Sequence, residues 1–388
     1  MSDGQWLFIQ AQDVWMFRDS KPFTAQQNFV ARSHFPPNPQ TMQGVIRTAY
    51  LESQNVNWQA YANGSADPTL YEKVGHGGIG GSGKATLGNL SISGPFIGIK
   101  SGDTVEPVFR APLDLLHNST SGAFAVLSPE KSETFYTNRS FDSWQPLGRS
   151  SNKEELQEAK NEERFREANG WLSSQQFTEY LNGKSVSGSL LKDSDIFEYE
   201  DRIGLGLNYD RRAAQKGLLY RATFIRPCDD IGLLVRINQT LFEQPGTIRI
   251  GGETRSGKFE IKNDIAFPRV QASSRVKIVL LTPAYFTDGW QPHDQNWSKW
   301  VGSGGKLVSA VLGKPMGISG WDIANKRSKP LRHYVPAGSV YYFENAAVTD
   351  EPFTESPANE DDGLFGAMGF GTVAIGVWQF LADKQSGE

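Results

Sequence analysis

The chain has 388 residues, enough for two or three domains with a substantial core, and its formal net charge is −4. A single cysteine, Cys228, excludes a disulfide framework and a cysteine-rich metal cluster. The first residues lack the basic and apolar regions of a signal peptide, and no window approaches about eighteen continuous apolar residues. We therefore expect a cytoplasmic protein with no membrane span.

The first part of the chain mixes strand and helix patterns. Residues 6–17 alternate and are rich in aromatic and β-branched residues, which predicts a strand, and the proline-rich residues 35–39 form a rigid turn after it. Thr41 is a plausible N-cap for a helix over residues 42–52. Residues 53–88 are polar and glycine-rich, so we expect a long excursion over the surface.

The middle of the chain predicts two more strands and two helices. Residues 90–99 and 217–225 have strand patterns, and Pro227 ends the second. Residues 153–168 predict a solvated helix because few of their side chains are apolar. Residues 173–183 predict a shorter helix with a serine cap and an Asn-Gly stop.

The C-terminal part is strand-rich, with few helical patterns between the strands. Strands are predicted over residues 231–237, 247–250, 276–281, 334–343 and 372–380. We place a domain boundary at Cys228-Asp229-Asp230, which divides the chain into residues 1–228 and 229–388. Two α+β halves of comparable strand content are consistent with a duplicated module.

Charge is unevenly distributed along the sequence. Between residues 202 and 226 there are six basic residues against one acidic residue, and 326–332 is a second basic run. Residues 350–362 carry six acidic residues and no basic one. A solvated face is the usual meaning of such runs, and an anionic partner such as a phosphate backbone is the sharper alternative.

The tail contains five glycines between Gly363 and Gly376, followed by an apolar strand pattern. Glycine loses the most backbone freedom on folding, so such a run suits a place where the backbone passes close to something. Exposed backbone N–H groups there could hold an anion such as a phosphate. A tight turn in a crowded sheet corner is the alternative.

Sequence motifs for catalysis are weak. Residues 75–80 match GxGxxG, and residues 78–84 match most of a Walker A motif, but Ala85 stands where Ser or Thr should bind Mg²⁺. A flexible loop is favoured over a P-loop enzyme that uses Lys84. The five histidines are scattered, and no nucleophile or zinc motif appears. We therefore expect no catalytic residues, no metal site and no cofactor.

A series of spaced motifs resembles one protein family. The motifs are WMFRDSKPF at 15–23, FPPNPQTMQGVIRT at 35–48, DRIGL at 201–205, KGLLY at 216–220, IGGETR at 250–255, LTPAYF at 281–286, GWD at 320–322, VPAGSVYYFE at 335–344 and the glycine-rich tail. In this order they resemble the third subunit of the type III-B CRISPR effector, the Cmr complex, within the repeat-associated (RAMP) superfamily. The resemblance covers about residues 6–380. Residues 62–88, 153–168 and 350–362 depart from it as insertions.

The resemblance implies a fold and a role. The fold is α+β, with two ferredoxin-like (RRM-type) modules that carry glycine-rich loops and inserted segments. The subunit is expected to bind the 5′ handle of the CRISPR RNA in antiviral defence. The resemblance also implies contacts with the large polymerase-like signalling subunit and the backbone subunit, and an indirect encounter with target RNA. By the same resemblance we expect that it is not the nuclease.

Single-stranded RNA is held by backbone amides and basic side chains on its phosphates, and by aromatic or guanidinium planes on its bases. Residues 203–207 and 217–225 predict a hairpin that could protrude against RNA. The candidate RNA-binding residues are Arg18, Arg47, Arg202, Gly204, Arg211, Arg212, Lys216, Gly251, Gly252, Arg255, Gly369 and Gly371. Each of these arginines could instead form a structural ion pair. A RAMP endoribonuclease that processes repeat RNA, with His34 as general base, remains the alternative function.

Overall fold

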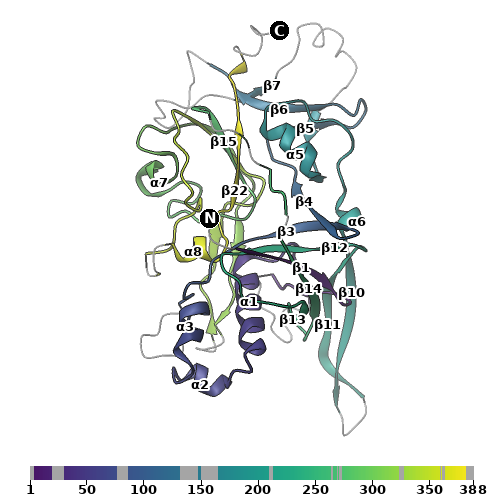
Figure 1. The fold of residues 1–388 in the computed structure, drawn as a ribbon. Coiled ribbons are helices and arrows are strands. Elements are labelled where there is room, and N and C mark those ends of the chain that lie inside the picture. The colour runs from purple at the N-terminus through teal and green to yellow at the C-terminus, as the bar shows by residue number, and fades with distance from the viewer. Residues whose placement is uncertain are drawn as a thin grey trace.

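The computed structural model describes residues 4–19, 30–76, 86–131, 147–149, 165–208, 213–263, 265–268, 270, 273–322, 327–358, 360 and 363–381. Within these residues the chain has a mixed α+β fold in which antiparallel sheets dominate and most helices are short (Figure 1). The predicted fold class is confirmed at this level.

The largest sheet has seven strands in the order β13-β14-β1-β12-β3-β4-β9. They are β1 (Gln5–Ala11), β3 (Ile92–Ser101), β4 (Thr104–Arg110), β9 (Trp171–Leu172), β12 (Ile231–Ile237), β13 (Gly246–Arg249) and β14 (Ser256–Lys262). Alternation divides the side chains between two cores. Leu7 and Leu233 face the core that contains helix α1, whereas Phe8 and Leu234 face a smaller cluster with Phe96. The central strands are therefore apolar on both faces.

Helix α1 (Pro39–Ser53) covers one face of this sheet through Met42, Ile46 and Tyr50. It begins before the predicted cap, Thr41, because Pro39 suits the first helical turn, where a backbone N–H would have no partner. Two short helices, α2 (Trp58–Ala62) and α3 (Pro68–Val74), follow where a surface excursion was predicted. The side chains of Asn57 and Asp67 cap them.

The second major sheet has four strands in the order β16-β21-β15-β22. They are β15 (Val276–Leu280), β16 (Lys306–Val311), β21 (Val340–Glu344) and β22 (Val373–Val377). All five residues of β15 are buried. One face packs on an aromatic cluster that includes Phe286, Trp297 and Phe353, with η1 (His293–Gln295) and α7 (Ser298–Val301) beside it.

The segment from β5 to α6, which we call the insertion, packs against the other face of that sheet. It contains a sheet ordered β7-β6-β5-β8, with β5 (Leu115–Asn118), β6 (Phe124–Pro129), β7 (Leu147–Arg149) and β8 (Phe165–Glu167), followed by α5 (Ser174–Leu181) and α6 (Asp193–Ile196). The predicted helix 173–183 is confirmed, with Ser173 and Gln176 forming a capping box. The end of the predicted helix 153–168 is instead strand β8, which pairs with β5, and residues 153–164 lie outside the described residues.

A buried polar network joins the insertion to the second sheet. The Asp114 carboxylate accepts hydrogen bonds from the Tyr180 hydroxyl at 2.7 Å and the Tyr342 hydroxyl at 2.5 Å. The Lys277 Nζ lies 3.9 Å from Asp114 and 3.3 Å from the centroid of the Tyr180 ring. All four side chains are buried, so this network fixes how the insertion docks.

Two small two-stranded sheets in one arm of the chain, together with the tail, complete the described structure. β17 (Met316–Ile318) pairs with β20 (Arg332–Tyr334), and β18 (Trp321–Asp322) pairs with β19 (Arg327–Ser328). The Gln40 side chain of α1 donates to Ser319 O at 2.6 Å, which ties this arm to the first core. Helix α8 (Leu364–Ala367) precedes β22.

The predicted boundary at residues 228/229 does not separate the sheets. β12, β13 and β14 follow this position, yet β12 pairs with both β1 and β3, and β14 pairs with β1. The second sheet begins only at β15. Without β12, the facing edges of β1 and β3 would have unpaired backbone N–H and C=O groups next to the core. The first sheet therefore includes strands from both sides of the predicted boundary.

Candidate nucleic-acid interface

A long β-hairpin extends from the first core. Its strands β10 (Phe197–Asn208) and β11 (Ala213–Pro227) pair antiparallel, and β2 (Val30–Ala31) adds in parallel to β11. Figure 1 shows the hairpin projecting away from both sheets. The hairpin predicted between residues 203 and 225 is confirmed, and it is longer than predicted.

Charged side chains form a network at the base of the hairpin, on one of its faces. Both Arg202 and Arg226 donate to the Glu200 carboxylate, each through Nε at 2.7 Å. Asp13, from the loop after β1, lies 3.4 Å from Arg202, 3.1 Å from Arg226 and 3.4 Å from Arg255. We call these five residues the basal cluster. Three guanidinium groups against two carboxylates leave it with an excess of one positive charge.

The basal cluster rests on an aromatic ring. The guanidinium groups of Arg202 and Arg255 lie 4.8 Å and 4.9 Å from the centroid of the Phe224 ring. Phe224 packs with Val14 and Met16 in a small core of its own. The Nε of Arg255 is buried and has no hydrogen-bond partner among the described residues. The cluster therefore offers guanidinium groups that are held in place against an aromatic ring.

The arginines set the ionisation of their carboxylate partners. For Asp13, slight desolvation alone would raise the pKa, but hydrogen bonds from Arg226 and Arg202 hold it below its usual value. Hydrogen bonds from the same arginines lower the pKa of Glu200. The Asp13 carboxylate is exposed and the Glu200 carboxylate is partly exposed, so these ion pairs contribute little to stability and an incoming phosphate could replace them.

The structure brings together several predicted residues that are far apart in sequence. Gly252 N–H donates to Met16 O at 2.8 Å, which places the loop containing Gly251 and Arg255 against the segment that underlies Phe224. Trp15 pairs with Ile225 of β11, so Arg18 on the same segment also lies near the base of the hairpin. A Cβ on Gly251 would come within 2.7 Å of Met16 O. Gly251 therefore serves this close packing.

Other predicted residues have structural contacts. Arg47 donates to Val74 O at 2.9 Å and Thr86 O at 3.0 Å, so it fastens α1 to the end of α3. Gly204 lies opposite Tyr220, and a Cβ there would collide with the tyrosine ring. These contacts assign both residues a packing role in the described chain.

The glycine-rich tail approaches protein backbone. Gly369, with φ of +97°, lies where a Cβ would come within 2.8 Å of Gly94 O on β3. Gly371, with φ of +68°, lies where a Cβ would come within 2.6 Å of the Phe353 carbonyl carbon. Of the two partners expected for these glycines, RNA phosphate or an adjoining part of the protein, the structure supplies the second.

The predicted excess of positive charge between residues 202 and 226 is partly neutralised by acidic partners. Arg221 forms an ion pair with Asp201, and Arg202 and Arg226 share Glu200. Arg211 and Arg212 lie outside the described residues, and Lys216 is described only as part of strand β11. The excess at the base of the hairpin depends instead on Arg255, which comes from a different part of the chain.

A model of the CRISPR-associated protein family Cas_Cmr3 matches residues 7–378. The chain belongs to this family. It is therefore a component of a type III CRISPR effector, as the spaced motifs predicted.

Solved structures that resemble this chain do so at low sequence identity and with TM-scores below 0.5. A chain of the type III-B Cmr-beta complex bound to cognate target RNA is 18% identical, with 87% of this chain and 86% of that chain covered and a TM-score of 0.46. A chain of a Csm1-Csm4 cassette in complex with AMPPNP is 13% identical, with 97% and 96% covered and a TM-score of 0.38. These likenesses add nothing to the family assignment. No curated protein matches the chain.

His34, the base in the alternative endoribonuclease reading, is mostly buried in this Cas_Cmr3 chain. Burial lowers its pKa, so the imidazole is neutral at pH 7. Its Nε2 is buried and has no hydrogen-bond partner among the described residues. No three His, Cys, Asp or Glu side chains of the described residues gather as a metal site. No helix in the described parts of the chain is long and apolar enough to cross a membrane.

Sequence reasoning missed three members of this Cas_Cmr3 interface. Asp13, Glu200 and Phe224 join the arginines through contacts between distant parts of the chain, which no local pattern reveals. It also missed the apolar side chains on the opposite face of the hairpin. Ile203 is 72% exposed, and Leu205 and Leu219 are similarly open. The alternation of Ile203 and Leu205 with Arg202 and Gly204 in the sequence could have indicated a strand with one apolar face.

Proposed function

We propose that this Cas_Cmr3 chain binds single-stranded CRISPR RNA at its 5′ handle and uses the basal cluster for RNA phosphates and bases. Clustered guanidinium groups attract a phosphate backbone, and guanidinium planes held on a ring can stack on an unpaired base. The two-module, ferredoxin-like organisation implied by the sequence motifs belongs to the same proposal.

One observation carries this proposal. Arg202, Arg226 and Arg255 converge beside Phe224, although they come from separate segments, and Arg18 lies on the adjoining segment. A purely structural ion-pair network needs no excess of positive charge. The basal cluster has one, with three arginines against two carboxylates.

We further propose that the protein bridges the large signalling subunit to the backbone subunit and has no catalytic activity of its own. Family membership and the burial of His34 support this role. Incubation of the purified protein with repeat RNA, with and without Mg²⁺, tests it. Steady cleavage that is lost in His34→Ala would support the endoribonuclease instead.

Handle RNA binding by matched variants tests the RNA proposal. Arg255→Gln removes one positive charge and the stack on Phe224, so we expect about tenfold weaker binding and a shallower salt dependence. Glu200→Gln removes a competing carboxylate, so we expect tighter binding. Arg166→Gln, at an exposed position on β8 in the insertion, is the control and should bind like the wild type.

The opposite signs of the first two variants separate RNA contact from loss of structure. Both variants disrupt the same ion-pair network, so unfolding of the hairpin would weaken binding in both. Equal affinity of all three variants, or a wild-type affinity that does not change between low and high salt, would count against the proposal.

A further inference from the structure

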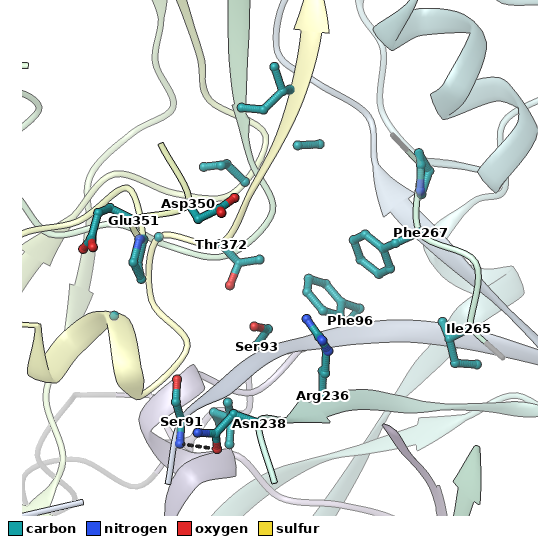
Figure 2. A pocket seen from close by; sticks show the side chains of 18 of the residues that line it. Ser91, Ser93, Phe96, Arg236, Asn238, Ile265, Phe267, Asp350, Glu351 and Thr372 are labelled. Atoms are coloured by element: carbon teal, nitrogen blue, oxygen red, sulfur yellow. Dashed lines mark hydrogen bonds between the residues drawn. The ribbon is translucent and has the colours of Figure 1, made fainter. Parts of the chain in front are cut away.

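A large cleft lies between the two major sheets. Its volume is about 980 Å³, and its walls come from β3 and β12 on one side and from β22 and residues 349–352 on the other. Phe96 and Phe267, with ring centroids 4.8 Å apart, form an aromatic wall. Figure 2 shows these two rings beside Arg236, which points into the cleft from β12.

One wall of the cleft is an open sheet edge. β22 is an outer strand of its sheet and pairs only with β15 among the described residues. Leu281 N–H donates to Thr372 O, so Thr372 faces β15. Antiparallel pairing alternates, which turns the N–H and C=O groups of Val373 and Ile375 away from β15. These residues line the cleft, and their outward groups have no partner in the described part of the chain.

The charges in the cleft favour a peptide over a nucleic acid. Arg236 is exposed on one wall, and Asp350 and Glu351 are exposed on the other. None of the three side chains forms an ion pair or hydrogen bond with another described residue. One positive charge against two negative charges repels a polyanion. An extended peptide with an acidic and a basic side chain would complement both walls.

We propose that an extended segment of another protein subunit adds to β22 as a fifth strand in this cleft. The backbone groups of Val373 and Ile375 pair with the segment, as in other sheet-edge recognition. An acidic side chain of the segment faces Arg236, and a basic one faces Asp350 and Glu351. The proposal rests on the proposed membership of a multi-subunit assembly, but not on RNA binding by the basal cluster.

Hydrogen exchange of the full chain tests this directly. The probe is the set of other protein subunits of the effector, added without RNA. Amides in residues 373–377 should exchange at least about tenfold more slowly after assembly, because Val373 and Ile375 N–H groups become hydrogen-bonded. RNA alone should not protect them. Protection by RNA alone, or by self-association of this chain, would overturn the proposal in favour of those occupants.

A pair of substitutions at one position isolates the backbone contact. Ile375→Pro removes an N–H that points away from β15, so the existing sheet keeps its hydrogen bonds. Ile375→Ala removes the same side-chain bulk and keeps the N–H. The proline variant should assemble about tenfold more weakly than the alanine variant. Equal assembly of the two variants would overturn the proposal.

The measurements separate this proposal from the proposed function. Should wild-type protein join the other subunits and bind handle RNA while residues 373–377 exchange as in the free chain, this proposal alone fails. Should the wild-type protein join no subunit, this proposal and the proposed bridging role both fail, whereas RNA binding by the basal cluster is judged by its own variants. Because exchange is measured on the wild type, the test holds even if Ile375→Pro does not fold.

Discussion

Gly371 has two separate constraints, which can be measured apart. Its φ is +68°, a conformation that L side chains rarely adopt, and a Cβ would press into the Phe353 carbonyl group. Gly363 has a similar φ of +78°, but nothing lies within 4 Å of its Cβ position. The two glycines therefore form a matched pair, one crowded and one open.

We expect Gly363→Ala to lower the free energy of unfolding by about 1 kcal/mol, from the backbone conformation alone. Gly371→Ala should lower it by about 3 kcal/mol, because steric overlap adds to the same conformational cost. Chemical denaturation of both variants gives the values. Equal losses would mean that residues 353–354 move aside and that close approach does not explain the glycine.

The buried pair Lys277 and Asp114 makes a second residue-scale prediction. Asp114→Ala leaves a buried ammonium group without its carboxylate, which should cost about 3–5 kcal/mol of stability. Lys277→Met should cost less, because two tyrosine hydroxyls still donate to the Asp114 carboxylate. The double variant should be more stable than Asp114→Ala. A double-mutant cycle measures this coupling, and additive losses would contradict it.

At the scale of the element, the hairpin has two chemically different faces. Alternation places the charged basal cluster on one face and exposed aliphatic side chains, such as Ile203 and Leu205, on the other. A polyanion and a protein surface could therefore meet the same hairpin from opposite sides. The lowered pKa values of Asp13 and Glu200 also set how the charged face responds to acid.

The hairpin should keep its ion pairs under mild acid. Asp13 and Glu200 have pKa values below their ordinary values of 3.8 and 4.5 in the folded protein. The contribution of these two carboxylates to the free energy of unfolding is complete at pH values above their pKa in the unfolded chain. It is lost only as the pH falls through their lower pKa in the folded protein. We expect the stability difference between wild type and Glu200→Gln to stay constant from about pH 7 to 5.5.

Carboxyl NMR titration measures these two groups directly. Titration midpoints for Asp13 and Glu200 below 3.8 and 4.5 would agree with the ion pairs of the basal cluster. Midpoints at or above those values would show that the arginines are turned elsewhere in solution. Arg255→Gln should move the midpoint of Asp13 and leave that of Glu200 unchanged, since Arg255 contacts only Asp13 of the two.

At the scale of the whole molecule, the order of strands determines which fragments can fold. β12 lies between β1 and β3, so a chain that ends at residue 228 lacks the centre of its own sheet. Its core would also lose Leu233, Val235 and Ile237. Cutting the chain at the predicted boundary should therefore remove structure from both products.

We expect fragment 1–228 to show no cooperative thermal unfolding. Fragment 1–263 contains β12, β13 and β14 and should recover a cooperative transition, although at a lower temperature than the full chain. Circular dichroism on heating compares them. A cooperative transition for fragment 1–228 would show that β1 and β3 can pair in another way.

The sequence predicted elements with strong local patterns. α5, β12 and β15 were recognised within a few residues because caps and apolar alternation are local signals. β14 was missed although Phe259 and Ile261 alternate with charged residues. Sheet order and the basal cluster could not be predicted, because both depend on contacts between residues more than a hundred positions apart.

The central position of β12 also bears on synthesis. A ribosome releases β1 and β3 long before residues 231–237, so the nascent chain carries two strand edges without their shared neighbour. Contacts this distant in sequence slow folding, and exposed edges invite pairing with other chains. The seven-stranded sheet can close only after β14 has left the ribosome, and until then the facing edges of β1 and β3 are open to pairing with other chains.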